Sequence, residues 1–163
     1  MLTHRDEIYR YAWRMVGDAQ DAQDLTQETF LRAYRAFERL EPDSNVRAWL
    51  YKIATNACLT FLKRRGRERM VTLDASASGL AVQTETPPDV VGRLELLREV
   101  AEAVEALPPR QRAAIVQRKY QGLSYGEIAA SLGCSEDTAR AHVYQGLRKL
   151  RAQFRDESEV RHG

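Results

Sequence analysis

The sequence predicts an all-α protein of two small helical domains joined by a flexible linker. Apolar residues recur at helical spacing in residues 30–61 and again in residues 94–154. Between these blocks, residues 70–92 hold small residues, threonines and the pair Pro87-Pro88, but no sustained period and no Lys or Arg. The 163 residues suffice for two domains with modest cores. We therefore expect domains at 1–69 and 93–154, a mildly acidic linker at 70–92 and a polar tail at 155–163.

The first block contains two helical patterns. In TFLRAYRAFERL the apolar series stops at Pro42 and consists of Phe30, Ala33, Tyr34, Phe37 and Leu40. In WLYKIATNACLTFL a sharper apolar stripe consists of Leu50, Ile53, Ala54, Ala57 and Phe61. The opposite stripe of this helix consists of Trp49, Lys52, Asn56, Thr60 and Lys63. Such a face suits nucleic acid, because cations meet phosphates while bases stack on rings. Packing of Trp49 over the core is an open alternative.

The second block begins with a helix over residues 93–107. Its apolar residues recur every three or four positions and are Leu94, Leu97, Ala101, Val104 and Leu107. Pro108-Pro109 ends this helix, and Pro109 can open the next one at its first turn. That next helix, RQRAAIVQRKY, is expected to end at Gly122.

A helix-turn-helix pattern follows in GLSYGEIAASLGCSEDTARAHVYQGLRKL. Ser124 and Glu127 form a capping box, and Gly133 tolerates the left-handed turn after the first short helix. Ser135 caps the second helix, whose inner face consists of Ala139, Val143, Leu147, Leu150 and Phe154. This unit typically places its second helix in the major groove of DNA, although a helical hairpin without DNA remains an alternative.

Charge is unevenly distributed although the net charge is only +2. Residues 18–28 hold four acids and no base, whereas residues 47–69 hold seven bases and one acid, Glu68. The basic stretch is a candidate contact for a polyanion, or else a solvated helix end.

Other classes of function lack support in the sequence. The chain has no apolar run long enough to span a membrane, and its charged first residues are unlike a secretory signal. Cys58 and Cys134 are far apart, which favours reduced thiols in the cytoplasm. No metal-ligand spacing, phosphate loop or nucleophile motif is present, so we expect no metal, no cofactor, no small-molecule substrate and no enzyme activity.

Three segments in order resemble the extracytoplasmic-function (ECF) sigma factors of bacterial RNA polymerase. DAQDLTQETFLRAYRAF resembles the family's polymerase-docking segment, and NVRAWLYKIATNACLTFLKRR resembles its −10 melting segment. ALPPRQRAAIVQRKYQGLSYGEIAASLGCSEDTARAHVYQGLRKLR resembles its −35 reading domain. The resemblance covers residues 7–69 and 93–152. It implies an initiation factor that binds core RNA polymerase, reads duplex −35 DNA, melts and reads the −10 element as a single strand, and is controlled by an anti-sigma factor.

The resemblance also implies roles for individual residues. The polymerase-binding residues would be Asp24, Gln27, Glu28 and Leu31. The residues at the −10 strand would be Asn45, Arg47, Trp49, Lys52 and Asn56, with phosphates held by Lys63, Arg64 and Arg65. The −35 duplex would face Arg140, Ala141, Tyr144, Gln145 and Arg148.

The second helix departs from the family's common pattern. Many relatives carry bases where this chain has His142, Gln145 and Leu147, and the pair Glu136-Asp137 is acidic for a helix that enters a groove.

Two other hypotheses for the function of the chain are open. One is a sigma mimic that binds a regulator without reading promoters. The other is a dimeric helix-turn-helix repressor, which leaves DLTQETFLRAYRAF unexplained.

Overall fold

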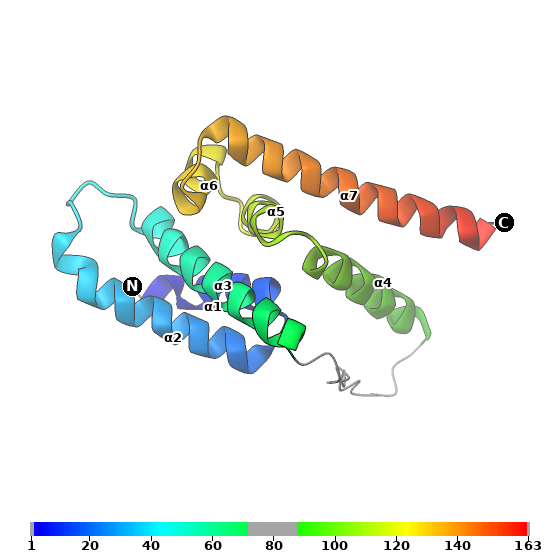
Figure 1. Cartoon of the computed structure of the whole chain (residues 1–163), viewed down its shortest axis with the longest axis horizontal. Helices are drawn as coiled ribbons and strands as arrows, with labels where there is room; N and C mark the ends of the chain where they lie inside the picture. Colours follow the sequence, from blue (N-terminus) through cyan, green and yellow to red (C-terminus); the bar gives the residue numbers. More distant parts are fainter. Residues whose placement is uncertain (1, 72–87, 163) are drawn as a thin grey trace.

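A computed structural model of the chain describes residues 2–71 and 88–162, and within these ranges it contains helices and no strand. The first domain is a bundle of α1 (Arg5–Val16), α2 (Ala19–Ala36) and α3 (Val46–Val71), as Figure 1 shows. A 3-10 turn at Leu2–His4 precedes α1, and another at Phe37–Arg39 follows α2. The all-α expectation is confirmed. The sequence analysis assigned no helix to residues 5–16, where α1 forms.

Local chemistry sets the ends of the first helices. The Asp18 side chain accepts a hydrogen bond of 2.9 Å from the Asp21 backbone N–H, so it caps α2. The Asn45 side chain accepts one of 3.0 Å from the Ala48 N–H and caps α3 in the same way. The apolar stripe predicted for α3 faces the core, because Leu50, Ala54 and Ala57 are buried.

The second domain contains α4 (Pro88–Glu105), α5 (Pro109–Ile115), a π-helical turn at Val116–Tyr120, α6 (Tyr125–Leu132) and α7 (Glu136–His162). Pro109 occupies the first turn of α5, as predicted. The capping box of Ser124 and Glu127 is present, and Gly133 ends α6 in the left-handed region at φ 65°. A β-carbon on Gly146 would lie 2.8 Å from Ile115 Cγ1, so only glycine permits the close approach of α7 to α5.

Three predicted boundaries differ from the structure. Helix α3 continues through Met70 and Val71 and α4 begins at Pro88, so both enter the expected linker; residues 72–87 of that linker lie outside the described residues. The expected tail is a continuation of α7, which runs to His162. The apolar stripe predicted for residues 93–107 is only partly buried. Val104 and Leu107 are buried, whereas Leu94 and Leu97 are 49% and 65% exposed.

The two domains share one core. Helix α6 lies along α3, and α5 contacts both α1 and α3. One continuous cluster therefore joins buried residues of the first domain, such as Tyr11 and Leu50, to Val116 and Ile128 of the second. None of the helices in the described ranges has the length and apolar character that a bilayer crossing requires.

Candidate nucleic-acid and protein interfaces

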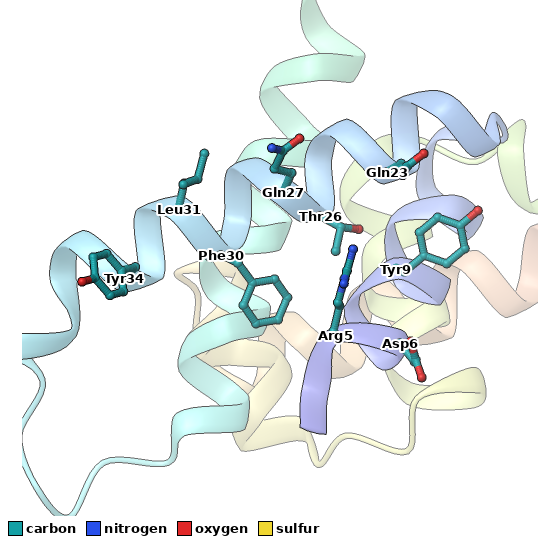
Figure 2. A pocket seen from close by; sticks show the side chains of 9 residues that line it. All are labelled: Arg5, Asp6, Tyr9, Gln23, Thr26, Gln27, Phe30, Leu31 and Tyr34. Atoms are coloured by element: carbon teal, nitrogen blue, oxygen red, sulfur yellow. The ribbon is translucent and has the colours of Figure 1, made fainter. Parts of the chain in front are cut away.

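The predicted protein-docking residues lie on one face of α2. Asp24, Gln27, Glu28 and Leu31 are spaced by three or four residues, which places them on adjacent turns of one side. Gln27 and Leu31 line an open groove of about 850 Å³ between α1 and α2. Figure 2 shows Phe30 and Arg5 at this groove as well, from α2 and from the start of α1.

This face combines acids with exposed apolar side chains. Leu31 is 50% exposed and Tyr34 is 77% exposed, although both are large and apolar in character. Glu28 forms an ion pair of 2.5 Å with Arg32, and Asp24 accepts a hydrogen bond of 3.2 Å from Gln20. Uncovered apolar side chains beside acids are typical of a surface that binds a partner carrying bases and apolar groups.

The start of α3, where the −10 residues were expected, is in contact with the second domain. The Asn45 amide donates a hydrogen bond of 3.2 Å to the Glu127 carboxylate of α6. The Arg47 guanidinium donates to Glu7 Oε1 at 2.7 Å and 2.5 Å and to the Gln121 backbone carbonyl at 2.6 Å. Gln121 in turn donates from its side chain to the Glu7 carbonyl at 3.2 Å. We call Glu7, Asn45, Arg47, Gln121 and Glu127 the domain clasp.

The charges of the clasp are mutually satisfied. Burial alone would raise the pKa of Glu7, but hydrogen bonds from Arg47 and Tyr51 outweigh it and hold that pKa below its ordinary value. The backbone N–H of Ser124 lowers the pKa of Glu127. Both carboxylates are therefore ionised at neutral pH and can accept hydrogen bonds from Arg47 and Asn45.

The rest of the predicted −10 face is mostly uncovered. Lys52, Asn56, Lys63 and Arg64 are exposed along α3. Trp49 is half-buried and packs on the core, which is the alternative left open for it. Arg65 does not join the exposed bases, because its guanidinium donates a hydrogen bond of 2.9 Å to the Val16 carbonyl at the end of α1.

A buried polar network lies behind the clasp. The Gln117 amide donates to the hydroxyls of Tyr11 at 3.0 Å and Thr55 at 3.2 Å, and those two hydroxyls are 2.8 Å apart. The Ser131 hydroxyl donates to the Gln117 amide oxygen at 2.6 Å. Four helical segments thus meet in one hydrogen-bonded group from which water is excluded.

Arg112 is a second buried link between the domains. Its guanidinium donates to the Met15 carbonyl at 2.5 Å and to the carbonyls of Glu105 and Leu107. The Met15 and Glu105 carbonyls belong to the ends of α1 and α4, where no intrahelical donor remains, and Leu107 lies in the turn after α4. Burial lowers the pKa of Arg112, and the carbonyl acceptors offset the cost of burying its charge.

These interface residues were not among those expected from the sequence. The sequence pattern gives Glu127 only a capping role and gives none to Glu7, Gln117 or Gln121. One signal was available for Arg112 and Gln117: they flank the apolar run Ala113–Val116, within a helix that has to bury that run. A polar residue inside an apolar stripe indicates a buried hydrogen-bonding group.

The predicted duplex-reading face of α7 is uncovered. All five of its residues are exposed: Arg140, Ala141, Tyr144, Gln145 and Arg148. Ser135 caps the helix through the Thr138 N–H at 3.1 Å, as predicted. Arg140 lies 3.7 Å from Glu136 and 3.4 Å from Asp137, so the acidic pair partly neutralises it.

No group of three or more His, Cys, Asp or Glu residues that could hold a metal occurs in ranges 2–71 and 88–162.

Comparisons with known proteins match both domains. The family model described as Sigma-70 region 2 matches residues 1–68, and the one described as Sigma-70, region 4 matches residues 97–150. The chain is 34% identical over 154 residues to the ECF RNA polymerase sigma factor SigL of Mycobacterium tuberculosis, covering 94% of this chain and 85% of that protein. It is 38% identical to SigE of Mycolicibacterium smegmatis, with 91% of this chain covered but only 57% of the relative.

Solved structures have the same fold. The sigma factor RpoE of Bartonella quintana, in complex with the anti-sigma factor NepR, superposes with a TM-score of 0.74 and 25% identity, covering 94% of this chain and 93% of that one. CnrH in complex with the cytosolic domain of CnrY superposes with a TM-score of 0.68 and 26% identity, covering 95% and 84%. Both likenesses extend over the two domains together.

Proposed function

Because this chain belongs to the ECF sigma factors of bacterial RNA polymerase, we propose that it directs core polymerase to a specific set of promoters through three of its surfaces. The α2 face of Asp24, Gln27, Glu28 and Leu31 docks on the polymerase. The α3 face binds the −10 strand, and the α7 face reads the −35 duplex. The synthesis of RNA belongs to the polymerase, so this chain performs no catalytic step and works where the polymerase does, in the cytoplasm.

One observation carries the proposal. A single chain that matches both family models presents an uncovered recognition helix in one domain and a basic, amide-bearing helix in the other. On α7, Arg140 and Gln145 have the donor geometry for guanine and adenine edges, and Ala141 leaves room for a thymine methyl. On α3, the exposed Lys63 and Arg64 suit phosphates, and Asn56 suits the edge of an unstacked base.

The domain clasp gives this sigma factor a closed resting arrangement. In that arrangement the Asn45 amide donates to Glu127, and Nε and Nη2 of Arg47 donate to Glu7 and the Gln121 carbonyl, so a DNA strand would have to compete for these donors. Reading of the −10 element therefore requires α6 to leave α3, and polymerase and promoter must supply the free energy of that separation.

An anti-sigma factor would act by preserving the closed arrangement. A groove of about 320 Å³ runs between α1 and α4 and is lined by apolar residues that include Trp13, Leu97, Val100 and Tyr120. Trp13 and Leu97 are 48% and 65% exposed, which is costly for side chains of this size without a partner. A partner bound across α1 and α4 would hold the two domains together.

A mimic that never reads promoters is the second candidate, favoured by the contacts of Arg140 with Glu136 and Asp137. Run-off transcription by core polymerase on a pooled promoter library separates the two. The proposal predicts enriched transcripts that share −10 and −35 elements at a fixed spacing, lost with Arg148→Gln and kept with Lys149→Gln. Binding to core polymerase with no specific transcript, even at low salt, would contradict it and favour the mimic.

A further inference from the structure

Helix α7 continues as a basic helix beyond the residues assigned to base reading. Arg148, Arg151 and Arg155 surround a shallow groove of about 270 Å³ together with Tyr144 and Ala152. All three arginines are exposed. Between Asp137 and Asp156 this helix has no acidic residue, and the acids Asp156, Glu157 and Glu159 follow only after Arg155.

These arginines share a face with the reading residues. An α-helix turns by about 100° per residue, so Arg140, Tyr144, Arg148, Arg151 and Arg155 fall within an arc of about 80°. Lys149 lies on the opposite side of the same turn. The series is therefore one stripe that begins among the −35 reading residues and ends near the C-terminus of α7.

The later arginines of the stripe are exposed on a helix that is held in place. Among the side chains described up to residue 155, Arg148, Arg151 and Arg155 form no ion pair, whereas Arg140 pairs with Glu136 and Asp137. The side of α7 next to the stripe is anchored, because Leu147 and Leu150 pack on the core and Phe154 is half-buried. Three exposed guanidinium groups on one face of an anchored helix are typical of a polyanion site.

The length of the stripe decides where its end lies on DNA. From Arg140 to Arg155 the helix rises about 22 Å, at about 1.5 Å per residue. The major groove is only about 12 Å wide. If the first turns of α7 occupy the groove, its C-terminal part has to pass over the flanking sugar-phosphate backbone.

We propose that Arg151 and Arg155 form a phosphate-binding patch that holds the DNA backbone beside the −35 element. This inference rests on the proposed reading of duplex DNA by α7. The patch carries no base specificity; it fixes the register of α7 in the groove and adds affinity that weakens with salt. In this way it compensates for the acidic start of the helix, where Glu136 and Asp137 repel phosphates.

Salt-dependent DNA binding by the full-length protein tests the patch. The probe is a fluorescent 30-base-pair duplex of mixed sequence, titrated from about 50 to 200 mM salt. Each of Arg151→Gln and Arg155→Gln is expected to reduce the slope of log K against log [salt] by about 0.9, the value for one lost phosphate contact. Lys149→Gln removes the same charge from the opposite side and is expected to change the slope much less.

Equal slope changes for Lys149→Gln and the two arginine variants would overturn the patch, because they would reflect net charge alone. Unchanged slopes in the arginine variants, while the wild type still binds duplex, would overturn the patch but leave the proposed −35 reading intact. Absence of wild-type binding at low salt would overturn both proposals. If the two arginine variants bound core polymerase more weakly but kept the wild-type slope of log K against log [salt] for duplex DNA, the patch would bind an acidic protein surface. That result would contradict the proposed contact with the DNA backbone.

Discussion

The two helices that would meet promoter DNA begin in the same way but in different surroundings. Asn45 caps α3 and Ser135 caps α7, each by accepting a hydrogen bond from the N–H three residues later. Beyond the cap, Ala139 of α7 is buried, but Arg140 and Ala141 in its second turn are exposed. The first turn of α3 lies against the second domain, which accepts hydrogen bonds from both Asn45 and Arg47.

This difference would let one chain keep one of its two proposed DNA-binding surfaces uncovered while the other is covered by the second domain. Phosphates and base edges would compete for the donors of Arg47 with a carboxylate and a carbonyl of the protein itself. On α7 the contacts of the reading residues are exposed ones: Arg140 with Glu136, Asp137 and the Tyr125 ring, and Gln145 with the Gln111 amide at 3.2 Å. The contacts that cover α3 come from residues that also cap and pack the second domain, so separation of α6 from α3 and the proposed −10 reading would be linked.

The largest expected effect comes from removing the buried charge that joins the domains. Arg112→Met leaves the carbonyls of Met15, Glu105 and Leu107 without their donor. We expect the free energy of unfolding to fall by about 3 kcal/mol, measured by urea denaturation. Arg98→Gln, in an exposed pair with Glu102, should change it by less than about 0.5 kcal/mol. A similar small loss in both variants would mean that Arg112 does not link the domains.

A somewhat smaller effect is expected from the network behind the clasp. Gln117→Leu keeps the approximate volume but leaves the hydroxyls of Tyr11, Thr55 and Ser131 with fewer partners. We expect the free energy of unfolding to fall by about 2 kcal/mol. The radius of gyration measured by small-angle scattering should increase, because the two domains separate more often. Gln145→Leu, on the uncovered face of α7, is the control and should leave the radius unchanged. A compact Gln117→Leu protein with wild-type stability would refute this role.

A modest effect on DNA binding is expected from Glu127→Gln. Glutamine retains the capping box with Ser124 but removes the negative charge that faces Asn45 and Arg47. A loss of about 0.5 kcal/mol at this contact would raise the affinity of the free protein for single-stranded −10 DNA roughly twofold. Fluorescence anisotropy with a labelled single strand measures it. Unchanged affinity would show that the Glu127 contact does not compete with DNA.

The smallest effect is the response of the clasp to acid. The pKa of Glu7 is lower in the folded chain than in the unfolded chain, so its ionised form stabilises the fold and holds Arg47, which in turn donates to the Gln121 carbonyl of the second domain. That contribution is complete above the unfolded value, about pH 4.3, and is lost as the pH falls through the lower folded value. The interdomain distance should therefore lengthen on acidification below about pH 4.3 in the wild type. The Glu7→Gln variant should lack this component, and an identical acid response in both would exclude Glu7 as its source.

The helices and their caps could be predicted from the sequence because their causes are local. Ser124 and Glu127 are three residues apart, and Pro109 and Gly133 act through their own backbones. The clasp could not be predicted, because Arg47 meets Glu7 and Gln121 across separations of 40 and 74 residues. Polar contacts between distant segments leave no periodic pattern. The same reason explains why Arg65 was expected among the DNA-binding bases. Its guanidinium instead donates a hydrogen bond to the Val16 carbonyl at the end of α1, a contact that no local pattern predicts.

The most direct test of the account is the distance between α3 and α6 before and during initiation. Spin labels at Thr60→Cys and Ala130→Cys, with Cys134 replaced by Ser, report it by pulsed electron resonance. Burial raises the pKa of Cys58 to about 12, so that thiol should stay unlabelled. The account predicts one narrow, short distance in the free protein and a longer one in the complex with core polymerase and melted promoter. The same short distance in a transcribing complex would contradict it.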